Sequence, residues 1–382
     1  MALWRFWVSL AIGLAVLATP CRSQEPPPSE LQRLFDRLQQ NPFDIELNFR
    51  YAELAIEQDR LRSALAAYER ILATDPENAE AKAGVERIRR LLRPEFTDAT
   101  VIGGGQYESN PRRAGKGVSG GDDVLAVTQA DVIDERRIGQ YRLRSEADFF
   151  ANFHDRFTEI DYGRVAANSG PILGLHEDWE IRPAIGGGYA WLDGQTFYGE
   201  GSSLLSLYSL GAGPLRRVDL LFEYDKVSET FARRDAYQIA LSPQLYWVNR
   251  VTDQDIVLLS PFYRFNGVVG SGPPGIGPSA QPFPLESHQF GGRIDYYVAF
   301  SGDVAVDANF TGYYQPFNEH VFNGSGLRRD RYLSPGAQVI LKEFLSKRHD
   351  LIFAYQFEDN SSNDDTETFD NHILSVRSLW RF

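Results

Sequence analysis

The side chains that most often carry chemistry are scattered along this chain. No serine nucleophile elbow, phosphate loop or dinucleotide fingerprint occurs. The glycine triplets at 103–105 and 186–188 stand inside alternating segments, where glycine marks a bend or a close approach of two backbones. The six histidines show none of the spacings typical of a metal site: His154, His176, His288, His320, His349 and His372. We therefore expect no enzymatic activity, no cofactor and no metal.

Length and charge narrow the class of protein. The chain has 382 residues and a formal net charge of -13, which favours two domains and argues against a nucleic-acid partner. Its mean hydropathy of -0.34 is that of a soluble protein. A transmembrane β-barrel has the same low value, because every second residue of its strands faces a polar lumen. Low hydropathy therefore does not argue against the membrane.

The first residues have the pattern of a secretion signal. Arg5 precedes an unbroken run, 6–18, in which Ser9 is the single polar residue. This run is too short to span a bilayer and has the length of a signal-peptide core, so we expect residues 1–23 to be removed after Ser23. A lipidated N-terminus at Cys21 is the alternative, but Pro20 stands where a lipoprotein signal needs a small residue.

Residues 24–93 are predicted to form a helical segment. Ala, Leu, Glu and Arg recur there at helical spacing, and Pro42 and Pro76 lie 34 positions apart, which is the tetratricopeptide period. The segment resembles that family, which implies that Ala52 and Ala64 let two helices approach closely, Tyr68 packs over the gap and Pro76 ends the second helix.

One complete repeat is visible, flanked by half repeats at 29–40 and 79–92. The first helix of such a repeat lines the concave groove, so the resemblance places Glu46, Phe49, Glu53 and Glu57 there. The groove is either a docking surface for a client polypeptide in the periplasm or part of a packed spacer at the mouth of a barrel. The sequence leaves both open.

Residues 97–382 are predicted to form a transmembrane antiparallel β-barrel of about 14 strands. Apolar and charged side chains alternate in 141–150, 217–225 and 350–358, which puts the two kinds on opposite faces of each strand. The predicted strands start near Ala99, Val124, Ile138, Thr158, Trp179, Phe197, Arg217, Asp235, Ile256, His288, Asp303, Leu333, Asp350 and Phe369.

Short and long connections are expected to alternate along this region. The long ones are 109–122, 270–284, 316–328 and 360–368, all rich in Gly, Pro, Asn or Asp. Short periplasmic turns and long outer loops are typical of barrels in the Gram-negative outer membrane, and an even strand number puts both chain ends in the periplasm. The helical segment is then periplasmic too.

The chain ends on a strand pattern that suits barrel closure. Alternate apolar residues run to the last position, and an aromatic C-terminus is the usual signal for the barrel-assembly machinery. We expect the outward face of the closing strand, and its contact with membrane lipid, to be carried by Leu374, Val376, Trp380 and Phe382.

The order of segments, together with one short motif, resembles the surface lipoprotein assembly modifier family. The motif is Tyr107, Glu108, Ser109 and Asn110, which matches the Tyr-Asp/Glu-Ser-Asn turn after the first barrel strand of that family. The resemblance implies an outer-membrane translocator that helps lipoproteins reach the cell surface, with periplasmic repeats that engage the client or its chaperone. The short repeat region departs from the family.

Two other functions are compatible with the sequence. Exopolysaccharide exporters also join periplasmic repeats to an outer-membrane barrel, although with longer repeat arrays and larger barrels. Aromatic side chains along the lumen would favour a path for sugars, since sugar rings stack on them. The lumen faces assigned from alternation carry Arg, Asp and Glu instead. A passive porin-like channel is the third possibility.

Overall fold

The computed structural model describes residues 29–176, 178–211, 213–231, 234–269, 285–300, 302–321 and 326–382. The predicted signal peptide and Cys21 lie outside these ranges. The chain divides into two compact units, residues 1–93 and 94–382, which are helical and all-β respectively.

Four helices form the first unit: α2 (Ser29–Gln40), α3 (Ile45–Glu57), α4 (Leu61–Thr74) and α5 (Ala79–Leu91). Asp44 and Asn78, 34 positions apart, each begin a helix by accepting a hydrogen bond from the backbone N–H three residues on. Both are N-cap residues of the preferred types, so the period seen in the prolines recurs in the caps. Among the described residues no helix is long and apolar enough to cross a membrane.

An apolar core holds the helices together. Ala52 and Ala64 are completely buried, and Tyr68 packs so closely on Gly84 that a Cβ there would lie 2.7 Å from the ring. Asn48 is buried in this core as well, and its amide is satisfied by the carbonyls of Pro42 and Asp44 and by Arg70. The interior of this unit is therefore apolar around Asn48, whose amide is hydrogen-bonded on both its nitrogen and its oxygen.

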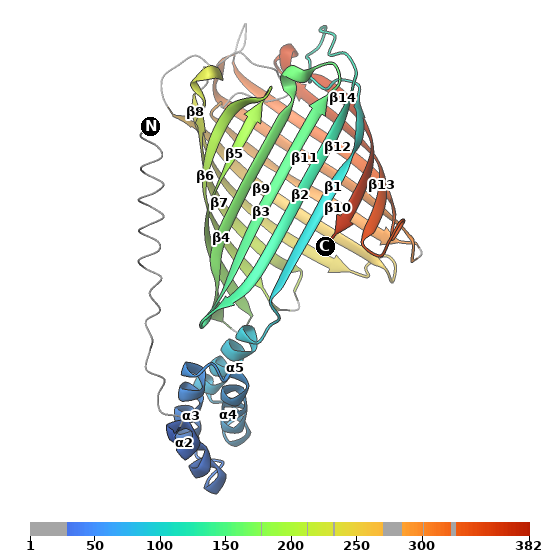
Figure 1. Ribbon diagram of the computed structural model, residues 1–382. Coiled ribbons are helices and arrows are strands. Elements are labelled where there is room, and N and C mark those ends of the chain that lie inside the picture. Colours follow the sequence, from blue (N-terminus) through green and yellow to red (C-terminus); the bar gives the residue numbers. More distant parts are fainter. Residues whose placement is uncertain are drawn as a thin grey trace, which may run out of the picture. The chain divides into compact units, whose positions relative to one another are not determined.

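Fourteen antiparallel strands close into a barrel in the second unit, as predicted (Figure 1). Each strand pairs with its sequence neighbours, and the last pairs with the first. The strands are β1 (Phe96–Glu108), β2 (Asp123–Ile138), β3 (Tyr141–His154), β4 (Tyr162–His176), β5 (Trp179–Leu192), β6 (Gln195–Ser209), β7 (Leu215–Val227), β8 (Asp235–Val248), β9 (Asp255–Val269), β10 (Ser287–Ala299), β11 (Val304–Val321), β12 (Leu327–Leu341), β13 (His349–Ser362) and β14 (Phe369–Arg381).

The barrel is apolar outside and polar inside. Its exposed large side chains, such as Leu241, Phe290 and Phe353, stand on the outer face of the strands. The alternate residues face the lumen and include buried charges such as Arg182 and Glu358. In a closed barrel the backbone N–H and C=O groups of every strand find hydrogen-bond partners on the neighbouring strands, and an apolar exterior suits contact with lipid. This is therefore a membrane-spanning barrel of the outer-membrane kind.

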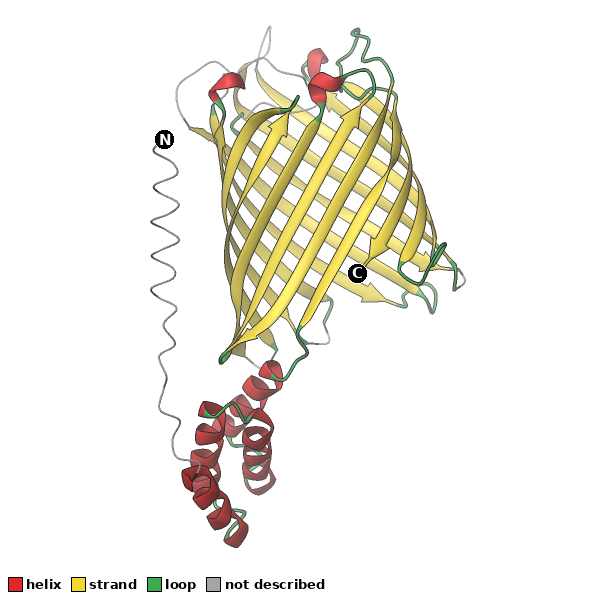
Figure 2. Ribbon diagram, viewed as in Figure 1, coloured by secondary structure: helices red, strands yellow, loops and turns green. Residues whose placement is uncertain are grey.

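The two rims of the barrel differ. One, which we call the turn rim, holds both chain ends of the barrel; the other, the loop rim, holds the short helical turns η1 (Thr158–Ile160), η2 (Glu229–Phe231) and η3 (Asp365–Glu367) (Figure 2). The loop rim has one tight connection, Asp193-Gly194, where both residues have positive φ as in a two-residue hairpin. The predicted alternation of short and long connections holds only in part, because the turn-rim connections 249–254 and 342–348 are as long as the loop-rim connection 363–368.

Four predicted strand starts were wrong by three residues or more. Ala99 lies three residues inside β1. Ile138 ends β2, and Thr158 belongs to η1. Leu333 lies inside β12. The strands β11 and β12 both extend into the predicted loop 316–328 and pair as far as Val321 and Leu327. This extension is polar, so it lacks the alternation that a lipid-facing strand shows. The predicted loop 270–284 and residues 322–325 lie outside the described residues.

Candidate functional site

The Tyr-Glu-Ser-Asn motif lies at the loop rim, where the first and last strands meet. Tyr107 points outward, while Glu108 is buried and accepts a 2.8 Å hydrogen bond from the Asn371 amide of β14. The Asn371 side-chain oxygen accepts from the backbone N–H of Asn110, at 2.9 Å, and Ser109 accepts from the N–H of His372. The motif is therefore a clasp between β1 and β14.

Further side-chain contacts connect the clasp to the loop 109–122. Arg113, from this loop, forms an ion pair with Glu358 at 3.2 Å, and Glu358 also accepts hydrogen bonds from Asn371 and Tyr332. Burial by itself would lower the pKa of Arg113, but the Glu358 and Glu108 carboxylates raise it above the ordinary value. The loop is thereby tied to the lumen wall.

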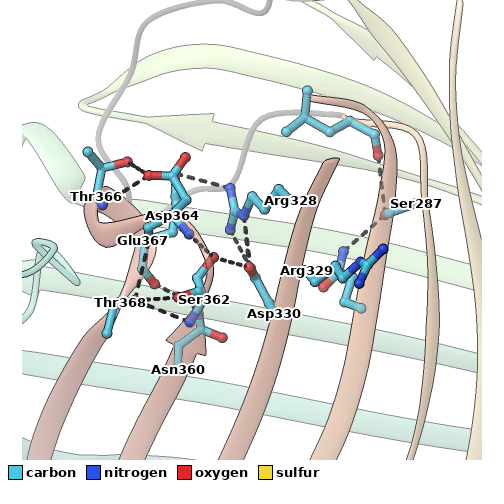
Figure 3. Close-up of polar contacts among 12 residues, drawn as sticks. Ser287, Arg328, Arg329, Asp330, Asn360, Ser362, Asp364, Thr366, Glu367 and Thr368 are labelled. Carbon is cyan, nitrogen blue, oxygen red and sulfur yellow. Dashed lines mark hydrogen bonds and ion pairs between the residues drawn. The ribbon is translucent and has the colours of Figure 1, made fainter. Parts of the chain in front are cut away.

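Next to the clasp, the loop rim carries a polar network that holds η3 (Figure 3). Arg328 binds Asp330 through two nitrogens and reaches Glu367 at 3.0 Å. Ser362 donates to Asp330 and accepts from the backbone N–H of Asp364, which in turn caps η3. The network orders the β13–β14 connection, and Lys116 N–H bonds to the Asp365 carbonyl, which joins it to the loop 109–122.

Ion pairs line the lumen near the turn rim. Glu146 lies 2.8 Å from Arg144 and 3.3 Å from Arg182, which is fully buried. Arg217 pairs with Asp219 at 2.6 Å. These residues come from β3, β5 and β7 and alternate in sign across the wall. The expectation of a charged lumen holds for this part of the barrel.

An acidic cluster lies on β6 and β7, farther toward the loop rim. Carboxylate oxygens of Glu200, Glu223 and Asp225 lie within 4.8 Å of one another, and Arg164 contacts Glu200 at 2.6 Å and Asp148 at 2.7 Å. Carboxylate oxygens are ligands that hard cations prefer. Sequence reasoning missed this cluster, because it depends on the register of two strands.

Aromatic side chains also face the lumen, contrary to what the assigned faces suggested. Tyr313 and Tyr332 are parallel, with ring centroids 4.7 Å apart, and Phe262 lies beside Tyr313. Tyr162 and Tyr198 form a hydrogen-bonded pair. The three segments whose faces follow from alternation, 141–150, 217–225 and 350–358, carry none of these rings. The lumen aromatics were therefore not predicted from the sequence.

The predicted groove residues separate into two groups. Glu46, Glu53 and Glu57 are exposed along one stripe of α3, and none forms an ion pair with a described residue. Phe49 is half-buried and packs edge-on against Tyr68, 6.0 Å away, so its ring contributes to the core. Pro76 is exposed and follows Asp75, the C-cap of α4.

The predicted closing residues Leu374, Val376, Trp380 and Phe382 are exposed on the outer surface. The backbone N–H of Phe382 donates to the Ala99 carbonyl of β1, which extends the pairing by one residue beyond β14.

The histidines with described side chains bind neighbouring polar groups. The partners of His154, His288, His349 and His372 are Asp161, Tyr263, Ser378 and Tyr355 respectively.

No protein-family model matches the chain, and no curated protein matches it. Solved structures with a similar fold are bacterial outer-membrane barrels. A bacterial polysaccharide outer membrane secretin is 11% identical with a TM-score of 0.41, over 74% of this chain and 98% of that one. OmpT, an outer membrane protein of Vibrio cholerae, is 7% identical with a TM-score of 0.42, over 76% and 99%. An anion-selective porin from Comamonas acidovorans is 10% identical with a TM-score of 0.39, over 76% and 99%. Scores at this level do not distinguish among the functions of such barrels.

Proposed function

We propose that this protein is an outer-membrane translocator that promotes the surface display of one or a few lipoproteins. The observation that carries the proposal is the Tyr107–Asn110 motif, which follows a helical repeat unit and occupies the end of the first barrel strand, as in the surface lipoprotein assembly modifier family. The clasp gives three of the four motif residues a physical reason, because Glu108, Ser109 and Asn110 all form hydrogen bonds with Asn371 or His372 of the last strand.

The helical unit is the proposed receiver of the client or of its chaperone. The stripe of Glu46, Glu53 and Glu57 offers exposed carboxylates at helical spacing, and none of the three forms an ion pair with a residue that the structure describes. A basic segment of a client would be attracted to this stripe, chiefly through its association rate. The lumen, whose wall carries charges of both signs, would give a polar polypeptide a hydrated route.

The test is deletion of the gene, followed by protease shaving of whole cells and immunoblotting of surface lipoproteins. We expect one or more lipoproteins to become protected from the protease. Charge reversal at Glu53 and Glu57 should weaken display while the barrel assembles normally, whereas Glu86→Lys on α5, outside the stripe, should leave display intact. Unchanged exposure of every lipoprotein, together with loss of secreted polysaccharide, would favour an exporter instead.

A further inference from the structure

A continuous part of the lumen wall differs from the rest because its polar side chains are uncharged. Five inward positions on four neighbouring strands, β8 to β11, carry amides or a hydroxyl: Gln238, Asn266, Ser287, Gln289 and Gln315. They form a chain of hydrogen bonds of 3.0–3.3 Å that runs from Gln238 through Asn266, Ser287 and Gln315 to Gln289. Other parts of the described lumen wall carry ion pairs, such as Glu146 with Arg182 and Glu200 with Arg164.

Aromatic rings border this amide chain. Tyr313 and Tyr332 lie parallel within 14°, and Phe262 is tilted beside Tyr313. Gly291, between β9 and β11, makes room for them: a Cβ at this position would lie 2.8 Å from the Phe262 ring and 2.5 Å from the Tyr313 Cβ. The Tyr332 hydroxyl donates a 2.7 Å hydrogen bond to the Glu358 carboxylate, which fixes the position of the Tyr332 ring.

One cation lies where the amides and the rings meet. The Arg264 guanidinium is 4.5 Å from the centre of the Phe262 ring and donates a 3.3 Å hydrogen bond to Gln289. It forms no ion pair with a described residue. Arginine has five N–H donors, so the long bond to Gln289 leaves most of its donors for another group.

We propose that this amide–aromatic wall binds the sugar rings of a saccharide within the lumen. The faces of the rings suit the C–H groups of a pyranose, and amides suit its hydroxyls, because both groups donate and accept. Arg264 adds a donor for a hydroxyl or for a sugar carboxylate. This site is independent of the lipoprotein proposal, since it needs neither the helical unit nor the motif at Tyr107–Asn110.

Saturation-transfer NMR on the full-length protein in lipid nanodiscs tests the proposal. The probes are maltohexaose, hexagalacturonate and, as a polymer without sugar rings, a glycine–serine hexapeptide. We expect both saccharides to bind in the millimolar range and the peptide not to bind. Replacing Tyr313 and Tyr332 together by Leu should weaken saccharide binding about tenfold. The matched control is Tyr246→Leu, which removes an inward ring outside the wall and should change nothing.

Arg264→Gln separates the two kinds of saccharide, because it should weaken hexagalacturonate more than maltohexaose. Folding of each variant is checked by heat-modifiable migration on gels. If the double tyrosine variant fails this check, the double variant Gln238→Leu and Gln315→Leu is measured in its place. It removes two of the amides proposed to bind the sugar hydroxyls and should also weaken saccharide binding. Absence of saccharide binding, equal binding of the peptide, or unchanged affinity in the folded variants would overturn the proposal.

Discussion

The helical unit and the barrel place their side chains in opposite ways. In residues 29–93 the interior is apolar, built on side chains such as Ile71 and Ile88, and charges lie outside. In residues 94–382 the apolar side chains lie outside, and Arg182 and Glu358 lie inside. The stability of the helical unit thus depends on apolar burial from water, whereas the barrel depends on closed backbone pairing, lipid contact and lumen ion pairs. The same substitution should therefore have opposite effects in the two units.

The largest effect should come from removing the end of the closing strand. Replacing Trp380 and Phe382 by Ser takes away the exposed aromatic residues that we expect the barrel-assembly machinery to recognise, and should lower the amount of assembled barrel severalfold. Immunoblots of outer-membrane fractions, with heat-modifiable migration as the folding readout, measure this. Leu379→Ser, at the preceding position of the same strand, is the control, and normal levels of the double variant would contradict the role of these residues.

A charge inside the helical unit should be the next most damaging. Ile71 is 1% exposed, so Ile71→Glu both removes a core side chain and buries an unpaired carboxylate, at a cost of at least about 3 kcal/mol. Limited proteolysis of the full-length protein should show rapid cleavage within residues 29–93 while the barrel stays intact. The exposed Glu69→Gln should behave as wild type. Resistance of the Ile71 variant would show that the unit has support beyond its own core.

Two consecutive barrel residues test the inside-out arrangement directly. Leu241 is exposed near the middle of β8, and Ser242 faces the lumen opposite Asp219. Leu241→Arg should destabilise the barrel by about 2–4 kcal/mol, as for arginine at the midplane of lipid-facing strands. Ser242→Arg should cost little, because a counter-charge is adjacent. Denaturant unfolding in lipid vesicles measures both, and equal costs would mean that the faces are assigned wrongly.

Sequence reasoning went far for the barrel because alternation is a property of one strand at a time. Ten of the fourteen predicted strand starts lie within two residues of the observed ones, and the exceptions are Ala99, Ile138, Thr158 and Leu333. Contacts between side chains on different strands could not be predicted from the sequence. Tyr313 and Tyr332 meet, and Glu200 meets Asp225, only through the register of neighbouring strands. The role of the Tyr107–Asn110 motif likewise needed Asn371, more than 260 positions away.

The clasp should contribute less to the stability of the barrel than the lipid-facing side chains do, but more than an exposed hydrogen bond does. Asn371→Leu keeps the size of the side chain and removes the hydrogen-bond partner of the Glu108 Oε2 atom and of the Asn110 N–H, at about 1–3 kcal/mol for each such group. The expected result is a lower thermal unfolding temperature of the barrel in detergent. Asn318→Ala, which removes one exposed hydrogen bond to Glu286, is the control. An unshifted temperature in the Asn371 variant would mean that the seam does not need the clasp.

The smallest effect should come from the contact between two loops at the loop rim. Burial tends to raise the pKa of Glu159, but its bonds to Arg112 and to the backbone lower the pKa below the ordinary value. The ionised form is thus stabilised by folding, so this contribution is present above the ordinary glutamate pKa and is lost as the pH falls through the folded value. Both side chains are about two-fifths exposed, so we expect less than about 1 kcal/mol. Glu159→Gln should therefore reduce the acid-side loss of barrel stability by this small amount, and a profile identical to wild type would contradict the contact.

The pairing of β1 with β14 also sets the order of events during biogenesis. Thr100 pairs with Arg381, so the final ladder joins residues 281 positions apart. Closing so long a loop is entropically costly and cannot begin until the last residues have been synthesised and exported. Until then β1 has one partner only, and its other edge offers unpaired backbone groups to any neighbouring strand. The unclosed precursor therefore carries an aggregation-prone edge for as long as its two ends remain apart.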